Sequence, residues 1–335
     1  MNAAAESFWR GRRVLVTGCS GLLGSWLTAR LVEVGARVVG LVRDWVPESL
    51  LVRSGTIDRI ATVRGSITDG ETIDRIFPEY EIQTCFHLAA MTVVSVANQV
   101  PVPALETNVR GTWLLLEAAR QWGRVEQLVV ASSDKAYGTS AALPYTETSP
   151  LAACHPYDAS KACADILART YAHSYGIPIA VTRCANIYGG GDLNWSRIIP
   201  GTIRSVLSNQ RPVIRSDGTM RRDYVYVRDV VAAYLTLAEA MRDGAQPGAV
   251  FNLGGGAPRT VLEVVRTIIR LSEHPQLEPV VLGAVSNEIQ DQYLSAARAQ
   301  AMLGWTPRFT LEDGLREALA WYRDVLAGST PPAPP

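Results

Sequence analysis

The chain has 335 residues, 47% of them apolar, and its 32 basic side chains balance 32 acidic ones. This composition excludes a disordered or collagen-like protein, and the lack of net charge argues against nucleic acid as the main partner. No apolar stretch reaches the ~20 residues of a membrane-spanning helix and no signal peptide precedes the first expected strand, so we expect a cytoplasmic protein without a membrane partner.

Short apolar runs alternate with helical patterns through the first half of the chain. The expected strands are 13–17, 36–42, 60–63, 83–88, 128–132 and 177–183, and the expected helices include 25–34, 69–77 and 104–121. Strands that alternate with helices form βαβ units. This half therefore predicts an α/β fold with a Rossmann-type, doubly wound parallel sheet.

Shorter elements, separated by Gly and Pro, follow from about Gly189. They are expected strands at 211–215 and 250–253 and expected helices at 260–271 and 311–326. The pattern divides the chain into a Rossmann domain of residues 1–188, to which later segments return, a smaller C-terminal α/β lobe of mainly 189–327, and a proline-rich, disordered tail at 328–335.

A glycine-rich loop, TGCSGLLG, joins the first expected strand to the first expected helix. Gly18 permits a tight turn, Gly21 lets the backbone approach a pyrophosphate, and Gly24 lets the helix pack closely on the sheet. Leu22 and Leu23 lie in the same loop, next to the helix N-terminus that favours an anion. The loop therefore predicts a site for NAD or NADP, and it makes the first domain an NAD(P)-binding domain.

The end of the second expected strand leaves the choice between the two cofactors open. Val42 occupies the position where an acidic residue often contacts the ribose, and Arg43 and Asp44 follow it. Arg43 suits a 2′-phosphate, whereas Asp44 suits a 2′-hydroxyl.

Two lysines stand out because the other thirty basic residues are all arginines. Lys161 follows Tyr157 by four residues, a spacing that places both side chains on one face of a helix. The lysine ammonium would then lower the pKa of the tyrosine toward neutrality. Ser132 and Ser133 lie at the end of the fifth expected strand, and Lys135 follows them.

These motifs resemble those of the extended short-chain dehydrogenase/reductases, specifically the nucleotide-sugar epimerases and dehydratases. The resemblance covers roughly residues 12–325 and includes HLAA at 87–90, SSDKAYG at 132–138, YDASK at 157–161 and RRDYVYVRDV at 221–230. It implies that Ser133, Tyr157 and Lys161 oxidise a sugar C4 hydroxyl by hydride transfer to a tightly bound nicotinamide cofactor. The implied cofactor contacts also include Ala89 and Ser132.

The pair Asp134-Lys135 narrows the resemblance to the 4,6-dehydratases, and most of all to the CDP-glucose 4,6-dehydratases. In such an enzyme the C4 ketone acidifies the C5 proton, a base removes that proton, and an acid protonates the departing C6 hydroxyl. Asp134 is the candidate acid. Lys135 is the candidate base, a role for which its amine must be neutral.

The resemblance also predicts the substrate contacts and the assembly. Arg222 is the first candidate for binding a substrate diphosphate, with Arg197, Asn186 and Thr92 as further contacts. We expect a homodimer in which helices 104–121 and 157–175 pair across a two-fold axis. The spacing of Leu114, Leu115 and Ala118 is compatible with this pairing and also with packing on the chain's own sheet.

Two other functions remain open, a nucleotide-sugar 4-epimerase and a catalytically silent dinucleotide-sensing scaffold. The nucleotide, the hexose and the pathway remain open as well. We expect no metal, because the four histidines and the five scattered cysteines lack ligand spacing, and His87 is expected at the edge of the core.

Overall fold

The computed structural model describes residues 7–140, 142–242, 247–284 and 289–328. Apart from Gly328, the predicted tail at 328–335 lies outside the described residues. No helix in these ranges is long and apolar enough to cross a membrane.

Seven strands of the described chain form one central sheet in which every neighbouring pair is parallel, in the order β11-β6-β5-β4-β1-β2-β3. This confirms the predicted Rossmann-type, doubly wound sheet. The strands are β1 (Arg13–Thr17), β2 (Arg37–Val42), β3 (Ala61–Arg64), β4 (Thr84–His87), β5 (Gln127–Ala131), β6 (Ile179–Cys184) and β11 (Ala249–Leu253).

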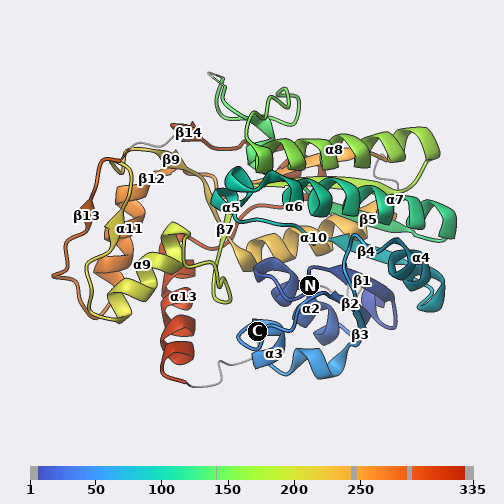
Figure 1. Cartoon of the computed structure of the whole chain (residues 1–335), viewed down its shortest axis with the longest axis horizontal. Helices are drawn as coiled ribbons and strands as arrows, with labels where there is room; N and C mark the ends of the chain where they lie inside the picture. Colours follow the sequence, from blue (N-terminus) through green and yellow to red (C-terminus); the bar gives the residue numbers. More distant parts are fainter. Residues whose placement is uncertain (1–6, 141, 243–246, 285–288, 329–335) are drawn as a thin grey trace.

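Helices cover both faces of the sheet, as Figure 1 shows. α4 (Gly70–Glu79), α7 (Gly111–Trp122) and α8 (Pro156–Tyr175) pack on one face, and α2 (Leu22–Glu33) and α10 (Val227–Arg242) pack on the other. Side chains of β1 alternate accordingly: Leu15 joins the core beneath α4 and α7, while Val14 and Val16 join the core beneath α2 and α10.

Two predicted helices differ in detail from the structure. α2 begins at Leu22 rather than Ser25, because Gly21 takes an extended conformation and acts as its N-cap. The predicted helix 104–121 is divided into α6 (Pro101–Leu105), a π-helical turn (Glu106–Arg110) and α7. Asn108 in that turn donates to the Met91 carbonyl and to Ser160 on α8, which joins the turn to its neighbours.

The expected strand 250–253 was wrongly placed in the C-terminal lobe. The structure shows it as β11, the edge strand of the central sheet beside β6. α10 precedes it and packs on the sheet, so the chain returns from the small lobe through a parallel crossover. All five residues of β11 are buried, which explains why its sequence is uniformly apolar except for Asn252.

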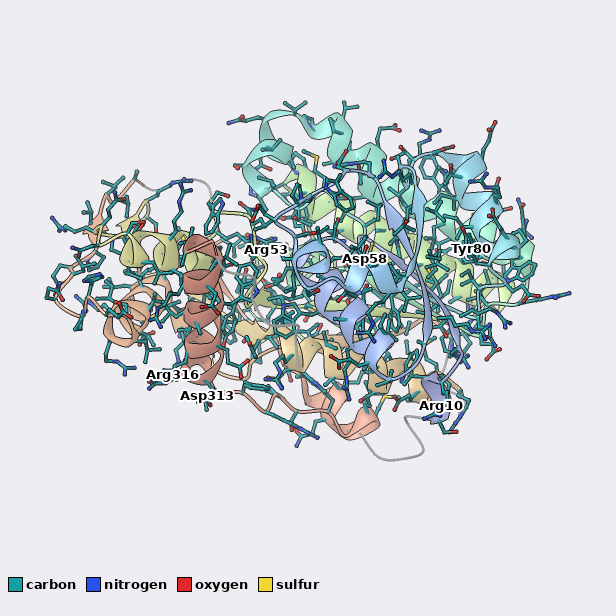
Figure 2. All side chains as sticks on the ribbon, turned by 90° about the horizontal axis from the view of Figure 1, so that it is seen from below. Arg10, Arg53, Asp58, Tyr80, Asp313 and Arg316 are labelled. Carbon is teal, nitrogen blue, oxygen red and sulfur yellow. The ribbon has the colours of Figure 1, made fainter. Side chains whose placement is uncertain are left out.

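The other C-terminal elements gather beyond the carboxyl ends of the central strands (Figure 1). The helices are α9 (Ile198–Leu207), α11 (Val261–Leu271) and α13 (Leu311–Leu326), and the short strands are β7 (Asn186–Tyr188), β8 (Val213–Ile214), β9 (Arg221–Arg222), β10 (Tyr224–Tyr226), β12 (Arg259–Thr260), β13 (Val280–Val281) and β14 (Asp291–Gln292). α12 (Ala297–Leu303) instead contacts β11 and α10. Figure 2 shows Asp313 and Arg316 of α13 on one side of the molecule and Tyr80, after α4, on the other. A domain boundary at 188/189 stays a prediction.

Candidate active site

The glycine loop lies where β1 and β4 part, at the carboxyl edge of the sheet. Gly18 has a φ of +71°, and a Cβ there would lie 2.7 Å from the backbone nitrogen of Ala89, which follows β4. A Cβ on Gly24 would overlap the carbonyl oxygen of Gly18, whereas at Gly21 the nearest atom is 3.4 Å away. The structure therefore requires glycine at 18 and 24 for close packing, and it leaves Gly21 beside open space.

This loop fits the phosphates of a dinucleotide. Gly21, Leu22 and Leu23 line a cavity, and among the described residues no side chain caps α2 at its N-terminus. The N–H groups of a first helical turn have no partner inside the helix, so they are available to an anion. Ala89 and Ser132 line the same cavity, and both were predicted cofactor contacts.

Arg43 and Asp44 lie at one end of this cavity, just after β2. The Arg43 guanidinium donates to the Asp44 carboxylate over 2.6 Å, and both side chains are exposed. Arg43 was the candidate contact for an NADP 2′-phosphate and Asp44 for an NAD 2′-hydroxyl. The two side chains are paired with each other at the position expected for the ribose.

Ser133, Tyr157 and Lys161 meet in the cavity, as predicted from their motifs. Ser133 is the N-cap of the 3₁₀ helix η3 (Asp134–Tyr137), immediately after β5, and its side chain lowers the pKa of Tyr157 in the first turn of α8 against the effect of burial. Lys161 lies one turn further along α8, and its Nζ donates to the Ala131 carbonyl over 2.7 Å. The carboxyl end of β5 and the N-terminal end of α8 therefore position all three side chains.

The electrostatics of Tyr157 differ from the expectation. Burial raises the pKa of Tyr157 to about 12, and the largest opposing influence is the positive charge of Arg197 rather than Lys161. Burial also lowers the pKa of Lys161 to about 8. The prediction that Lys161 lowers the pKa of Tyr157 is thus not borne out in the chain alone, because desolvation dominates at both groups.

Asp134 has the environment of a proton donor. Its side chain is 2% exposed, its Oδ1 accepts a hydrogen bond from Ser133 Oγ over 3.0 Å, and its Oδ2 has no partner among the described residues. Burial raises its pKa, against the opposing charge of Lys135. A carboxyl group in such surroundings favours the protonated form.

Lys135 is half-buried beside Asp134 and lines the cavity. Its Nζ donates to Oε1 of Gln292 over 3.0 Å. Gln292 is fully buried on β14, and no sequence pattern predicts this contact, because 157 residues separate the partners.

Asp158 is a second residue that the sequence analysis did not single out, although it stands inside the YDASK motif. It lines the cavity, is 4% exposed, and has an Oδ1 without a partner in the described chain. Burial raises the pKa of Asp158 to about 6, with Lys135 as the largest opposing influence. An acidic residue directly after the motif tyrosine was the available signal.

The two candidate phosphate-binding arginines are placed differently. Arg222 is 8% exposed and donates to the backbone carbonyls of Ile289 and Gln290 at 2.6 and 2.9 Å. Arg197 is more accessible, at 39% of its side chain, and is paired with the buried Asp192 at 3.0 Å. Both line the cavity, and Arg197 is the more accessible cation; which of the two contacts a substrate diphosphate stays a prediction.

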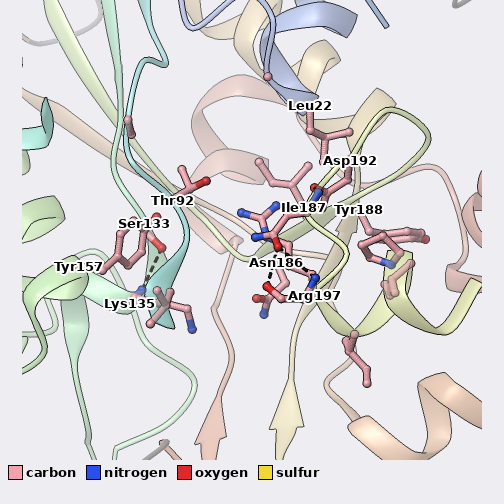
Figure 3. A pocket seen from close by; sticks show the side chains of 18 of the residues that line it. Leu22, Thr92, Ser133, Lys135, Tyr157, Asn186, Ile187, Tyr188, Asp192 and Arg197 are labelled. Carbon is pink, nitrogen blue, oxygen red and sulfur yellow. Dashed lines mark hydrogen bonds and ion pairs between the residues drawn. The ribbon is translucent and has the colours of Figure 1, made fainter. Parts of the chain in front are cut away.

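The remaining predicted contacts also reach the cavity. Thr92 is exposed in the loop after β4, and Asn186 on β7 donates through its side-chain amide to the Asp223 carbonyl over 3.1 Å. Figure 3 shows Ser133, Lys135 and Tyr157 on one side of the cavity and Asn186, Asp192 and Arg197 on the other.

One continuous cavity thus connects the glycine loop to the C-terminal elements. Its volume is about 1680 Å³, larger than the ~300–1,000 Å³ of typical small-ligand pockets, so it has room for a dinucleotide and a second nucleotide together. Among the described residues no group of three or more His, Cys, Asp and Glu side chains has the arrangement of a metal site.

His87 lies in the core, as predicted. Its ring nitrogens contact Thr17 Oγ1 at 2.8 Å and Thr112 Oγ1 at 3.0 Å, and burial lowers its pKa to about 3.

Comparison with known proteins finds similarity to enzymes that act on nucleotide sugars. Residues 14–254 match the NAD dependent epimerase/dehydratase family. CDP-glucose 4,6-dehydratase of Salmonella typhimurium is 31% identical, over 96% of this chain and 94% of the relative. dTDP-glucose 4,6-dehydratase of Xanthomonas campestris is 30% identical, over 92% of each chain.

Solved structures of similar proteins include both a dehydratase and an epimerase. dTDP-glucose 4,6-dehydratase from Bacillus anthracis in complex with NAD is 28% identical, with a TM-score of 0.81, over 94% of this chain and 97% of the other. UDP-glucose 4-epimerase from Thermotoga maritima with UDP-glucose is also 28% identical, with a TM-score of 0.84, over 94% and 99%.

Proposed function

Because this chain belongs to the NAD dependent epimerase/dehydratase family, we propose that it is a nucleotide-sugar 4,6-dehydratase, with CDP-glucose as the first candidate substrate. The observation that carries the proposal is the pair Asp134 and Lys135, which lines the cavity directly beside Ser133 and Tyr157. A 4-epimerase has no need of a second acid and base at this position, whereas an elimination needs both.

The Rossmann domain would hold NAD between the glycine loop and the carboxyl ends of β1, β4 and β5. When bound, NAD would supply reversible hydride transfer. The family name and the NAD complex of the Bacillus anthracis dehydratase support NAD. Asp44 would accept a hydrogen bond from the ribose 2′-hydroxyl, and its pairing with Arg43 leaves that guanidinium less available to a 2′-phosphate.

Tyr157 and Ser133 would act on the C4 hydroxyl. Tyr157 Oη takes the hydroxyl proton as C4 becomes a ketone, and Ser133 Oγ orients the oxygen by a hydrogen bond. Lys161 would keep its Nζ largely protonated near neutral pH, since its pKa is about 8, and would so supply a positive charge on the same face of α8 as Tyr157. The charge of Arg197, which opposes the raised pKa of Tyr157, acts in the same direction.

Asp134 and Lys135 would carry out the elimination. Lys135 Nζ removes the C5 proton, which the C4 ketone has made acidic, and Asp134 donates its proton to the departing C6 hydroxyl. The C5–H and C6–O bonds break and water leaves. Because C4 is oxidised and C6 is reduced, and Lys135 Nζ would return its proton to C5, the net reaction is loss of one water without net oxidation.

The substrate diphosphate would lie between the catalytic residues and the C-terminal lobe. Arg197 is the more accessible cation there, and Arg222, Asn186 and Thr92 complete the predicted contacts. Arg215 also lines this part of the cavity and is exposed, so it adds a positive charge that the sequence analysis had not singled out.

The first prediction concerns the product. Incubation of the protein with CDP-, dTDP-, GDP- and UDP-glucose is expected to give, for at least one of them, a product that has lost the mass of one water. Mass spectrometry and a sugar-specific separation provide the readout. A product of unchanged mass but altered retention would identify an epimerase instead, and no turnover with any substrate would favour the non-catalytic scaffold.

We further propose a homodimer formed by α7 and α8. Leu115 and Ala118 are buried in the chain's own core, so they are not the interface residues. Trp113 on α7 and Ile166 on α8 are instead 41% and 48% exposed and give these helices an apolar outer surface.

The expected molar mass in solution is therefore twice that of the chain. Light scattering at micromolar concentration measures it, and Trp113→Arg with Ile166→Arg is expected to reduce the mass to that of the monomer. A wild-type monomer at this concentration would contradict the proposal.

A further inference from the structure

Gln292 uses both of its hydrogen-bonding groups on the segment that carries the acid and base. Its Oε1 accepts from Lys135 Nζ over 3.0 Å, and its Nε2 donates to the backbone carbonyl oxygen of Asp134 over 3.3 Å. Gln292 is fully buried, so water does not reach its amide group to compete for either hydrogen bond. The amide therefore fixes the amine of Lys135 relative to η3 at two points.

The position of Gln292 is set by the lobe from which it comes. β14 pairs in parallel with β9, in a register that places Gln292 opposite Arg222. The Arg222 guanidinium also donates to the carbonyls of Ile289 and Gln290, just before β14. The glutamine side chain is thus held in place before any substrate binds, which is the condition for positioning another group.

The charge of its hydrogen-bond partner affects how readily the Lys135 amine loses a proton, and the Gln292 amide is uncharged. Among the described residues, Asp134 on η3 and Asp158 on α8 interact electrostatically with Lys135, and Arg222 on β9 lies opposite Gln292 and acts on Asp134. Burial raises the pKa of both carboxyls, that of Asp158 to about 6. An amide oxygen accepts a hydrogen bond from either an ammonium or a neutral amine, whereas a carboxylate at the same distance favours the ammonium.

We propose that Gln292 is the positioning residue of Lys135, which holds Nζ at the cavity wall through an uncharged acceptor and so leaves the amine able to lose its proton. This inference rests on the proposed role of Lys135 as the base that removes the C5 proton. It assigns a specific task in the reaction to a residue of the C-terminal segment that is not among the described residues lining the cavity.

Two variants separate the position of the amine from its charge. Gln292→Glu keeps the acceptor but adds a buried negative charge that favours the ammonium form of Lys135. The acid limb of the dehydration rate against pH is therefore expected to move to higher pH by about one unit, a roughly tenfold lower rate at any pH on that limb. Gln292→Met keeps the bulk but removes the acceptor, and we expect about tenfold lower kcat with unchanged KM.

The measurements use the full-length protein with the NDP-glucose that turns over fastest in the panel above. Single-turnover absorbance of the reduced nicotinamide reports oxidation at C4, and product mass reports elimination. Both variants are expected to oxidise C4 at the wild-type rate and to accumulate the reduced cofactor. Gln290→Glu, which adds the same charge at an exposed side chain two residues away, is the matched control and is expected to leave the pH profile unchanged.

Three outcomes would overturn the inference. The first is a pH profile of Gln292→Glu that coincides with that of the wild type, together with wild-type elimination by Gln292→Met. The second is equal loss of oxidation and elimination, or loss of folding in both variants, since either would assign Gln292 a purely structural role. The third is a wild-type protein that turns over its substrate without losing water, which would overturn the proposed function as well.

Discussion

Replacement of Tyr157 by Phe is expected to reduce kcat by about 10²- to 10⁴-fold, the usual contribution of a positioned acid or base. Only the hydroxyl is lost, and that hydroxyl is the group proposed to take the C4 proton. The ring is 7% exposed and packs with Ala97 and Ala104, so its aromatic carbons continue to fill this space in the variant. We therefore expect unchanged thermal unfolding and unchanged cofactor content per chain, while steady-state turnover measures the loss of kcat.

Tyr175→Phe provides the matched control. Tyr175 belongs to the same helix, is 57% exposed and packs through its ring against Tyr171, with ring centroids 5.1 Å apart. Loss of its hydroxyl is expected to leave kcat unchanged. Activity of Tyr157→Phe within a few-fold of the wild type would reject the assignment of Ser133, Tyr157 and Lys161 as the oxidising triad.

Substitution of Lys135 is expected to stop elimination without stopping oxidation. Lys135→Met keeps much of the bulk but removes the basic nitrogen, and Lys135→Arg keeps a cation that stays protonated near neutral pH. We expect both to lose dehydration by about 10²- to 10⁴-fold. Because oxidation at C4 depends on other side chains, substrate should still produce the absorbance of reduced nicotinamide, with little loss of water measured by product mass.

Lys161→Met gives the contrasting result, since Lys161 is the other lysine of the chain and serves the first step. It is expected to lose reduced-nicotinamide absorbance and dehydration together. Near wild-type dehydration by Lys135→Arg would contradict the assignment of Lys135 as base. The dehydratase proposal would then depend on Asp134 serving both proton transfers, and Asp134→Asn would have to block elimination.

Structural features that depend only on residues close together in the sequence were predictable. β1 has the predicted bounds, and the other predicted strands of the first half differ from the structure by a residue or two at their ends. A buried strand of a parallel sheet requires a short, continuous apolar run, and that requirement is visible in any window of the sequence. The glycine loop and the one-turn spacing of Tyr157 and Lys161 were predictable for the same reason.

The partners of β11 and β14 were not predictable from such windows. β11 has the composition of any short buried strand, and its place beside β6 depends on the crossover through α10. β14 has two residues, too few for a periodic signal. Pairing over more than sixty residues is decided by which surfaces remain to be covered after the local elements have formed.

The sequence by itself determined the family, the doubly wound sheet, the cofactor loop and the identity of the residues that enter the cavity, because each of these follows from a local pattern. Only the tertiary structure decided which arginine is the more accessible, that Gln292 holds Lys135, and that Asp158 shares the site. It also decided the direction of each pKa shift, as at Tyr157, where desolvation outweighs the nearby charges. Burial and hydrogen-bond partners arise from segments far apart in the chain, so no local pattern encodes them.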